Sequence, residues 1–307
     1  MKKKTRIIVI SSVILFFLIL YLGFCFAREK YHYLKNNIDL LNEKINVLLS
    51  PTKYDYSWIG KNSLVAHALG GVGTNHIAYT NSAEAFKQSY ENDFKILEVD
   101  LNVTNDLETV CVHNVNDWCL SVGVANIEDF TYNNFINKKI YGKYTPLDYK
   151  RLIQMLSIYS DVYIILDSKC ISEDKIRMEY SQIVNYAKKI DVSILDRVIP
   201  EVYNEEMLKI IMNSYPFKSI VYCLNQSDYV VGEVANICTR YGINLIEASA
   251  GRITSEEICY LKNCGFQISI FTINELINAE YYFDQGVDLL YSDKLMPMEC
   301  NTLKNSN

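Results

Sequence analysis

The 307-residue sequence has few prolines, few histidines and no tract of low complexity. It contains five prolines and four histidines. No motif recurs at a fixed period, which argues against a solenoid or other repeat architecture, and no biased segment indicates disorder. Half of the residues are hydrophobic. The chain can therefore bury a full core, as one large domain or two small ones.

Two motifs of metal and cofactor proteins are also missing. The nine cysteines include no pair at Cys-x-x-Cys spacing, which argues against a zinc site. No Gly-x-Gly-x-x-Gly follows the first apolar run, which counts against a dinucleotide-binding fold. In an exported domain, Cys111 with Cys119 and Cys259 with Cys264 are candidate disulfides. Free buried thiols are the alternative.

Charge is absent from residues 7–27, which are almost wholly apolar. A helix of this length spans roughly 31 Å, enough to cross the hydrocarbon core of a bilayer. Because residues 1–6 are basic, the sequence predicts a cytoplasmic tail at 1–6, a transmembrane anchor at 7–27 and an extracytoplasmic remainder. A cleaved signal peptide is the alternative, but no small-x-small cleavage site precedes Arg28, and Phe24 is too bulky for a lipoprotein signal before Cys25.

A helical stripe follows the anchor and ends at Ser50-Pro51. Its apolar residues recur every three or four positions: Leu34, Ile38, Leu41, Ile45 and Leu48. We interpret residues 28–62 as a helical stalk and linker. The stripe is also compatible with self-association as a short coiled coil.

Acidic residues dominate the chain beyond the anchor. The first 28 residues hold five basic side chains and no acidic one, which leaves 25 basic against 36 acidic residues and a formal charge of −11. Such a domain repels nucleic acid and anionic membrane surfaces, so we expect no nucleic-acid partner. An anionic substrate requires a cation or local basic residues to offset this field.

From Ser63 onward, short apolar runs alternate with segments of helical spacing. The expected strands are 64–66, 94–97, 162–166, 198–199, 219–223, 244–246, 267–271 and 287–290. The expected helices are 83–92, 147–157, 173–190, 204–213, 228–241, 254–263 and 275–284, with Gly242, Gly265 and Gly286 at C-cap positions. Eight strands alternating with helices predict a (β/α)₈ TIM-type barrel, and a doubly wound open sheet is the alternative.

The stretch 94–113 concentrates reactive side chains. Glu98 and Asp100 are two residues apart on a strand and so point the same way. Two such carboxylates repel unless a cation lies between them or one is protonated. A turn near Asp106-Leu107 returns the chain antiparallel and sets His113 roughly opposite Asp100. Two carboxylates and an imidazole together are typical of a metal-assisted hydrolytic site.

Polar residues also end other predicted strands, where a barrel of this type carries its active site. They are His67, Asp167, Lys169, Glu201, Glu247, Thr272 and Asn274. His67 and His113 are the two histidines at such positions, so we favour a functional role for both. Trp118, Tyr203 and Tyr291 are candidates to line a pocket, but we favour their interpretation as packing residues.

These segments together resemble the glycerophosphodiester phosphodiesterase family, which belongs with phosphatidylinositol-specific phospholipase C. The resemblance is carried by Val65-Ala66-His67 with Gly70, by residues 80–86, by the stretch from Glu98 to His113, and by residues 271–274 and 286–293. It implies a phosphodiesterase barrel over 63–295. Residues 114–146 would be an insertion over the active site, and residues 296–307 a C-terminal tail.

The resemblance also implies roles for the site residues. His67 and His113 would be the acid/base pair. Glu98, Asp100 and Asp167 would hold one divalent cation, Mg²⁺ or Ca²⁺, both of which take oxygen ligands. Lys169 would contact phosphate, and we assign Glu201 and Asn274 to substrate binding.

The implied reaction is metal-dependent hydrolysis of a glycerophosphodiester to an alcohol and a phosphomonoester. The expected substrate is a deacylated phospholipid, a lysophospholipid or an envelope glycerol-phosphate polymer. The expected protein is a single-pass cell-membrane enzyme whose catalytic domain is extracytoplasmic.

The sequence departs from the family pattern at five positions. Ala68 stands where the family usually has Arg, Thr80 where it has Glu, Ser82 where it has Thr, Asp167 where it often has Glu, and Asn114 where it has Asp. Two further functions therefore stay open. One is a cyclising phospholipase or sphingomyelinase-D-like lyase, and the other is a catalytically inactive, membrane-tethered binding protein.

Overall fold

The computed structural model describes Lys30 and residues 54–60, 62–71, 77–170, 172–227 and 229–304. The expected cytoplasmic tail, the anchor at 7–27 and the helical stripe of the stalk lie outside the described residues. Within the described ranges, no helix combines the length and the apolar character needed to cross a membrane. Membrane attachment and self-association through the stalk stay predictions.

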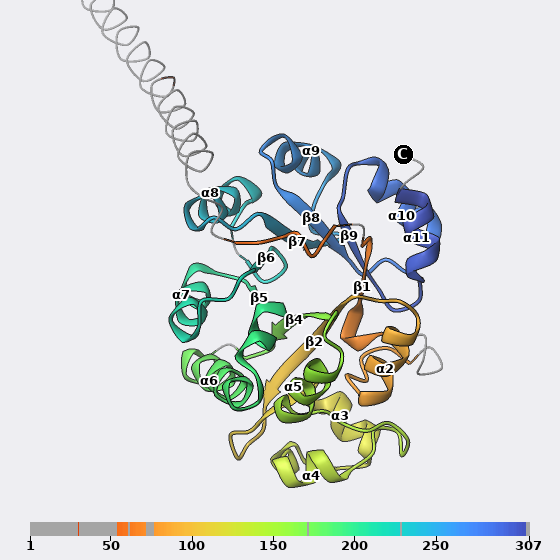
Figure 1. Cartoon of the computed structure of the whole chain (residues 1–307), viewed down its shortest axis with the longest axis vertical. Coiled ribbons are helices and arrows are strands. Elements are labelled where there is room, and N and C mark those ends of the chain that lie inside the picture. The colour runs from red at the N-terminus through yellow and green to blue at the C-terminus, as the bar shows by residue number, and fades with distance from the viewer. Residues whose placement is uncertain are drawn as a thin grey trace, which may run out of the picture. The chain divides into compact units, whose positions relative to one another are not determined.

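Eight parallel strands close into a barrel (Figure 1). They are β1 (Leu64–Ala66), β2 (Ile96–Val103), β4 (Tyr163–Ser168), β5 (Val198–Val202), β6 (Val221–Cys223), β7 (Leu245–Ser249), β8 (Gln267–Phe271) and β9 (Leu289–Ser292). The strand β1 pairs with the last strand, β9, where Val65 lies opposite Tyr291. It also pairs with β2, where Ala66 lies opposite Leu97. The predicted TIM-type barrel is confirmed, and the open-sheet alternative is wrong.

A ring of helices surrounds the barrel (Figure 1). They are α2 (Ala83–Glu91), α5 (Tyr149–Ile158), α6 (Glu173–Ile190), α7 (Glu205–Ser214), α8 (Val231–Tyr241), α9 (Ser255–Asn263), α10 (Leu276–Asp284) and α11 (Pro297–Lys304). The seven predicted helices match to within three residues at each end. Side-chain caps explain several starts: the Ser82 hydroxyl, for example, accepts a 3.2 Å hydrogen bond from the Ala85 amide.

The helix α11 occupies residues that the sequence analysis assigned to a tail. Its Cys300 is fully buried. The Lys304 ammonium donates hydrogen bonds to the carbonyls of Asp288, at 2.6 Å, and Asn62, at 3.2 Å. Residues 297–304 therefore pack against the barrel.

The predicted hairpin forms between β2 and β3 (Thr109–Cys111), which pair antiparallel. Its turn lies at the predicted position, since Leu107 has a positive φ of 69° and its amide bonds the Thr104 carbonyl at 2.9 Å. The register sets Leu101 opposite Cys111, and the Val112 amide donates to the Asp100 carbonyl at 3.0 Å. Val112, and not His113, therefore lies opposite Asp100, one residue from the predicted register.

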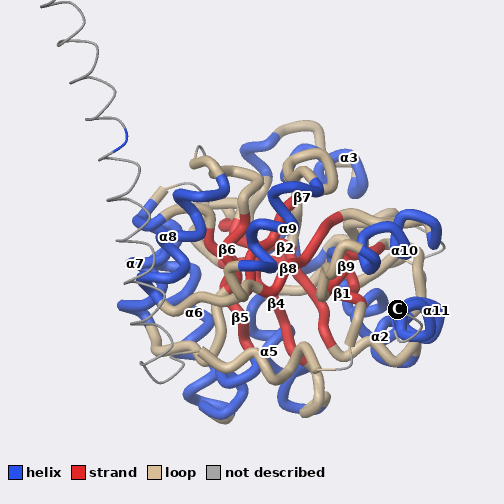
Figure 2. The backbone as a smooth tube through the Cα atoms, turned by 90° about the horizontal axis from the view of Figure 1, so that it is seen from above, coloured by secondary structure: helices blue, strands red, loops and turns tan. Residues whose placement is uncertain are grey.

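Residues 114–146 form a subdomain with its own small core. They contain α3 (Val115–Val122), α4 (Tyr132–Asn137) and a 3-10 helix, Ile127–Asp129, between them. Trp118 stacks on Phe135 and meets Phe130 edge-on. In Figure 2, α3 lies beyond one end of the strands. The eight cysteines of the described residues, Cys111 and Cys119 among them, are free thiols, so neither candidate disulfide is present.

The end of the predicted linker belongs to the barrel domain instead. Trp58 and Ile59 are buried and pack on the apolar layer inside the barrel, formed by Val65, Ile96, Ile165, Ile199, Val221, Leu245 and Leu289. The Trp58 indole donates to the Ser219 hydroxyl at 2.9 Å, and the Tyr56 hydroxyl donates to the Ile220 carbonyl at 2.8 Å. Residues 54–60 thus close the barrel on the side away from the polar strand ends.

This packing predicts a large stability effect. Trp58→Ala should lower the free energy of unfolding by about 3–5 kcal/mol, because it removes a buried aromatic ring from the apolar layer. Ile277→Ala is the control, since Ile277 is 72% exposed and such changes usually stay within about 0.5 kcal/mol. Urea denaturation measures both. Equal losses for the two variants would contradict the proposed packing.

Candidate active site

A cavity of about 370 Å³ lies at the C-terminal ends of the barrel strands. Its lining comprises His67, Tyr79, Glu98, His113, Asp167, Lys169, Glu201, Tyr203, Asn225, Gln226, Glu247, Ser249, Phe271, Thr272 and Tyr291. Six of the eight predicted site residues are in this lining, and Asp100 and Asn274 are not. No residue of 114–146 contributes to it. Tyr203 and Tyr291, interpreted from the sequence as packing residues, are wall residues of the cavity.

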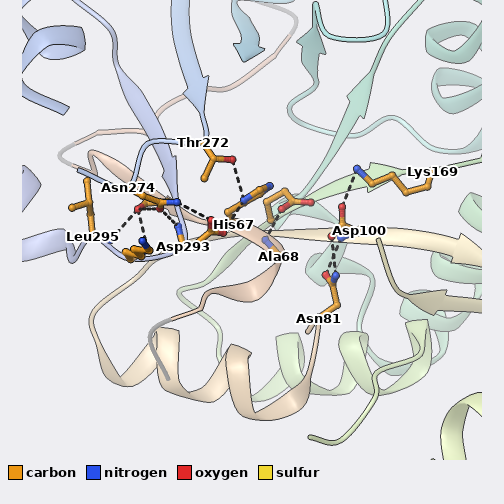
Figure 3. A network of polar contacts seen from close by, with 12 residues as sticks. His67, Ala68, Asn81, Asp100, Lys169, Thr272, Asn274, Asp293 and Leu295 are labelled. Atoms are coloured by element: carbon orange, nitrogen blue, oxygen red, sulfur yellow. Dashed lines mark hydrogen bonds and ion pairs between the residues drawn. The ribbon is translucent and has the colours of Figure 1, made fainter. Parts of the chain in front are cut away.

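His67 is held by a chain of polar contacts that joins the first and last strands (Figure 3). Its Nδ1 lies 3.0 Å from Asp293 Oδ1 and 3.3 Å from the Thr272 hydroxyl. The Asn274 amide donates to Asp293 Oδ2 at 3.0 Å, and Asn274 Oδ1 accepts from the Asp293 amide at 2.9 Å. Asn274 therefore orients Asp293 and is not among the lining residues of the cavity. Its role in substrate binding stays a prediction.

The turn after His67 depends on two glycines that allow a close backbone approach. A Cβ atom at Gly70, where φ is 101°, would lie 2.2 Å from the Ser89 hydroxyl. A Cβ at Gly71 would lie 2.7 Å from the Asp293 carbonyl oxygen. Atoms this close clash, so the small residues let the turn lie against Asp293. This approach keeps His67 within reach of its carboxylate partner.

Glu98, Asp100 and Asp167 form a buried cluster whose oxygens lie within 4.8 Å of one another. Asp100 Oδ2 accepts a 2.8 Å hydrogen bond from the Asn81 amide (Figure 3), and Asn81 Oδ1 accepts from the Asp100 backbone at 3.0 Å. Glu98 Oε2 accepts from the Ala68 amide at 2.7 Å, but Glu98 Oε1 is buried without a hydrogen-bond partner. Burial, with the charges of Asp100 and Asp167, raises the pKa of Glu98.

This donor set fits a divalent cation. Three carboxylates converge, and one of their buried oxygens has no protein donor, which is costly unless a cation or a proton compensates it. Oxygen ligands suit Mg²⁺ and Ca²⁺.

Lys169 is the cation that this cluster contacts. Its ammonium lies 2.9 Å from Asp100 Oδ1 (Figure 3) and also pairs with Asp167, whose other oxygen accepts from the Tyr203 hydroxyl. Burial lowers the pKa of Lys169, but the charges of Asp167, Asp100 and Glu98 outweigh it and hold the pKa above its usual value. Lys169 is therefore charged at neutral pH.

Tyr79 lies between the two histidines and was missed by the sequence analysis. Its ring centroid is 4.9 Å from that of His67 and 4.8 Å from that of His113. Burial, followed by the charge of Asp293, raises the pKa of its hydroxyl. The only available signal was its position directly before the Thr80-Asn81-Ser82 motif.

The family departures have local explanations. The Thr80 and Ser82 hydroxyls are buried 3.0 Å apart. Asn114 caps α3, since its side-chain oxygen accepts from the Asn116 amide at 2.8 Å. Ala68 donates its backbone amide to Glu98.

The cavity lining also includes three residues that were not predicted from the sequence: Asn225, Gln226 and Ser249. They belong to no sequence motif that indicates a functional site.

The sequence matches the glycerophosphoryl diester phosphodiesterase family model over residues 71–295, and the chain belongs to this family. Its members are phosphodiesterases that hydrolyse glycerophosphodiesters, and this chain is an enzyme of that class. No curated protein matches the sequence.

Solved structures share the fold at low sequence identity. A glycerophosphodiester phosphodiesterase from Parabacteroides distasonis has a TM-score of 0.64 at 16% identity, over 80% of this chain and 99% of that one. An Oleispira antarctica phosphodiesterase, solved with the product sn-glycerol-3-phosphate, has a TM-score of 0.63 at 16% identity, over 79% and 96%. One from Thermotoga maritima has a TM-score of 0.56 at 17% identity, over 80% and 97%.

The contact between Asp293 and His67 predicts a pH-dependent stability effect. Burial opposes ionisation of Asp293, but its hydrogen bond and charge interaction with His67, aided by Asn274, hold its pKa below the ordinary value of 3.8. A depressed carboxyl pKa stabilises the fold above the ordinary value, and this contribution is lost as the pH falls through the folded-state pKa. Asp293→Asn should therefore lower the free energy of unfolding by about 1.5–3 kcal/mol at neutral pH.

The difference between wild type and Asp293→Asn should shrink as the pH falls below about 4. Urea denaturation at a series of pH values measures it, with wild type as the reference at each pH. A difference that stays constant down to the acid limit would show that the Asp293 charge does not stabilise the fold.

Proposed function

We propose that this chain hydrolyses glycerophosphodiesters to an alcohol and a phosphomonoester, with one bound Mg²⁺ or Ca²⁺. The observation that carries the proposal is the meeting of His67, His113 and the carboxylate cluster at one cavity. Two imidazoles can serve as general base and general acid on opposite sides of a phosphate. Deacylated phospholipids, lysophospholipids and glycerol-phosphate polymers are the candidate substrates.

Glu98, Asp100 and Asp167 would hold the cation. Bound there, the cation supplies positive charge that offsets the acidic field and polarises the phosphate. Lys169 would add a second positive charge on the same side of the cavity. Together these groups would draw an anionic diester into a domain that is acidic overall.

His67 would act as the general base and His113 as the general acid, by analogy with the phospholipase. Asp293 and Thr272 engage Nδ1 of His67, so Nε2 is the nitrogen left for proton transfer. Asp293 also stabilises the imidazolium that forms when His67 takes the proton of the attacking hydroxyl. His113 would then donate a proton to the leaving alcohol oxygen.

The absence of Arg at position 68 keeps a cyclising lyase as the second candidate. In that reaction a hydroxyl of the substrate, and not water, attacks the phosphorus, and the first product is a cyclic phosphate. Phosphorus NMR at early times separates the two reactions, because hydrolysis by water yields no cyclic species.

We further propose that residues 7–27 anchor the enzyme in the cell membrane with the barrel outside the cytoplasm.

Removing either histidine tests the acid/base assignment. His67→Ala and His113→Ala should each lower kcat by roughly 10²–10⁴-fold, the usual contribution of one acid/base group. The double variant should be little slower than either single one, because groups that act as a unit are not additive. Release of glycerol phosphate measures the rates, and His32→Ala is the control. A fully active His113→Ala enzyme would exclude this residue as the acid.

The carboxylate cluster should respond differently from the histidines. Glu98→Gln and Asp100→Asn should weaken metal binding, so raising the metal concentration should partly restore the rate. Metal titrations of activity measure the shift, and EDTA should abolish wild-type turnover. Activity that persists unchanged in EDTA would exclude the metal role.

A further inference from the structure

The cavity contains a second pair of carboxylates that the proposed reaction does not use. Glu201 on β5 and Glu247 on β7 flank Cys223 on β6, and their ligand atoms lie within 4.8 Å of one another. Each glutamate is only 2% exposed, and both line the cavity. From the sequence, Glu201 is expected to bind substrate, and Glu247 is one of the polar residues that end the predicted strands.

Within the described part of the chain, this pair has no partner cation and few hydrogen-bond donors. Among the described residues, the Cys223 thiol is the side chain that hydrogen-bonds the Glu201 carboxylate. Glu247 accepts one long hydrogen bond, 3.3 Å, from the Ser269 hydroxyl. The Tyr291 hydroxyl is buried in the same wall and lies beside Glu247, but it makes no well-aligned hydrogen bond. Lys169 is already committed to Asp100 and Asp167. The pair therefore presents carboxylate oxygens with few protein donors to the cavity.

The surroundings of the pair favour a cation carried by an organic ligand. Phe271 and Tyr291 stand in the same wall with ring centroids 6.1 Å apart, and aromatic faces attract ammonium groups. Burial raises the pKa of Glu247 to about 8, and burial with the charge of Glu247 raises the pKa of Glu201, so a negative charge on either group is unfavourable without a cation beside it. A ligand ammonium can satisfy both carboxylates at once.

The position of the pair relative to the phosphate site sets the size of the ligand. Leu166 pairs with Pro200, so Asp167 and Glu201 are neighbours on adjacent strands, which lie about 4.8 Å apart. A negative phosphate at the Asp167 side and a positive group at the Glu201 side are therefore only a few bonds apart. The ester of a short amino alcohol has this separation of charge.

We propose that Glu201 and Glu247 form a subsite for the ammonium group of the substrate, so that the enzyme prefers glycerophosphodiesters of amino alcohols. The inference rests on the proposed function. It specifies the leaving alcohol, which the family alone does not. Esters with a neutral alcohol leave the two buried carboxylates without a partner.

Binding of two phosphomonoesters of nearly equal size tests the subsite without turnover. Titration calorimetry on the full-length protein compares phosphoethanolamine with propyl phosphate, which has a methyl group in place of the ammonium. Wild type should bind phosphoethanolamine at least about tenfold more tightly. Glu201→Gln and Glu247→Gln should each bring the ratio close to one, because they remove one of the negative charges.

Glu179→Gln is the matched control for these variants. Glu179 is also a fully buried glutamate, and burial raises its pKa to about 8, but it lies on α6 and is not part of the cavity lining. Its replacement should leave the tenfold preference intact. Circular dichroism shows whether each variant is folded. If a variant does not fold, the ratio of the two ligand affinities in the wild-type protein still tests the proposal.

Three results of the binding experiments would overturn the subsite. They are equal affinity of wild type for the two ligands, a preference that survives in both glutamine variants, and a second equivalent of divalent cation that is bound by wild type and lost in Glu201→Gln. The last result would identify a metal site instead.

Turnover separates failure of the subsite from failure of the proposed function. Equal rates on glycerophosphoethanolamine and glycerophosphoglycerol would reject the subsite alone. A clear binding preference without hydrolysis of either diester would reject the proposed hydrolysis and leave the subsite standing.

Discussion

The charge of the barrel interior is the constraint on which the site depends. Within the residues that the structure describes, five carboxylates converge at one end of the barrel and one lysine lies among them. Glu98, Asp100, Asp167, Glu201 and Glu247 are each at most 8% exposed, and Lys169 contacts only two of them. Charges buried to this degree are costly unless they are paired, protonated or bound to a cation. The proposed metal and the proposed ammonium subsite are the two compensations that we infer from this excess.

Closure of the barrel supplies the other requirement of the site. His67 and Asp293 are 226 residues apart in the sequence, yet they are neighbours because β1 pairs with β9. Gly71 permits the close approach, and Asn274 fixes the carboxylate. The orientation of the proposed base therefore depends on a contact that exists only when the first and last strands are joined.

Much of this arrangement was predictable because strands alternate their faces. The apolar layer residues Ile96, Ile165, Ile199 and Leu245 are each followed two positions later by an acidic cavity residue: Glu98, Asp167, Glu201 and Glu247. That period of two marked the polar strand ends from sequence alone. The helices were equally predictable from the sequence, because their apolar spacing and their capping residues are local signals.

The contacts that sequence reasoning missed are all non-local. Trp58 packs on the apolar layer inside the barrel, but it lies in a segment with no periodic pattern. Tyr79 lies in a loop and contacts both His67 and His113. Asn274 stands at a predicted strand end but turns to Asp293, which no spacing rule reveals. The one-residue error at His113 arose because the register of a hairpin depends on its turn geometry.

The most direct test of the account is calorimetric titration of Mg²⁺ and Ca²⁺ into metal-free protein. We expect one ion to bind per chain for at least one of the two metals, with binding strongly weakened in Glu98→Gln and retained in Glu179→Gln. Binding of neither metal by wild type, or equal binding by Glu98→Gln, would contradict the claim that a cation compensates the buried carboxylate cluster.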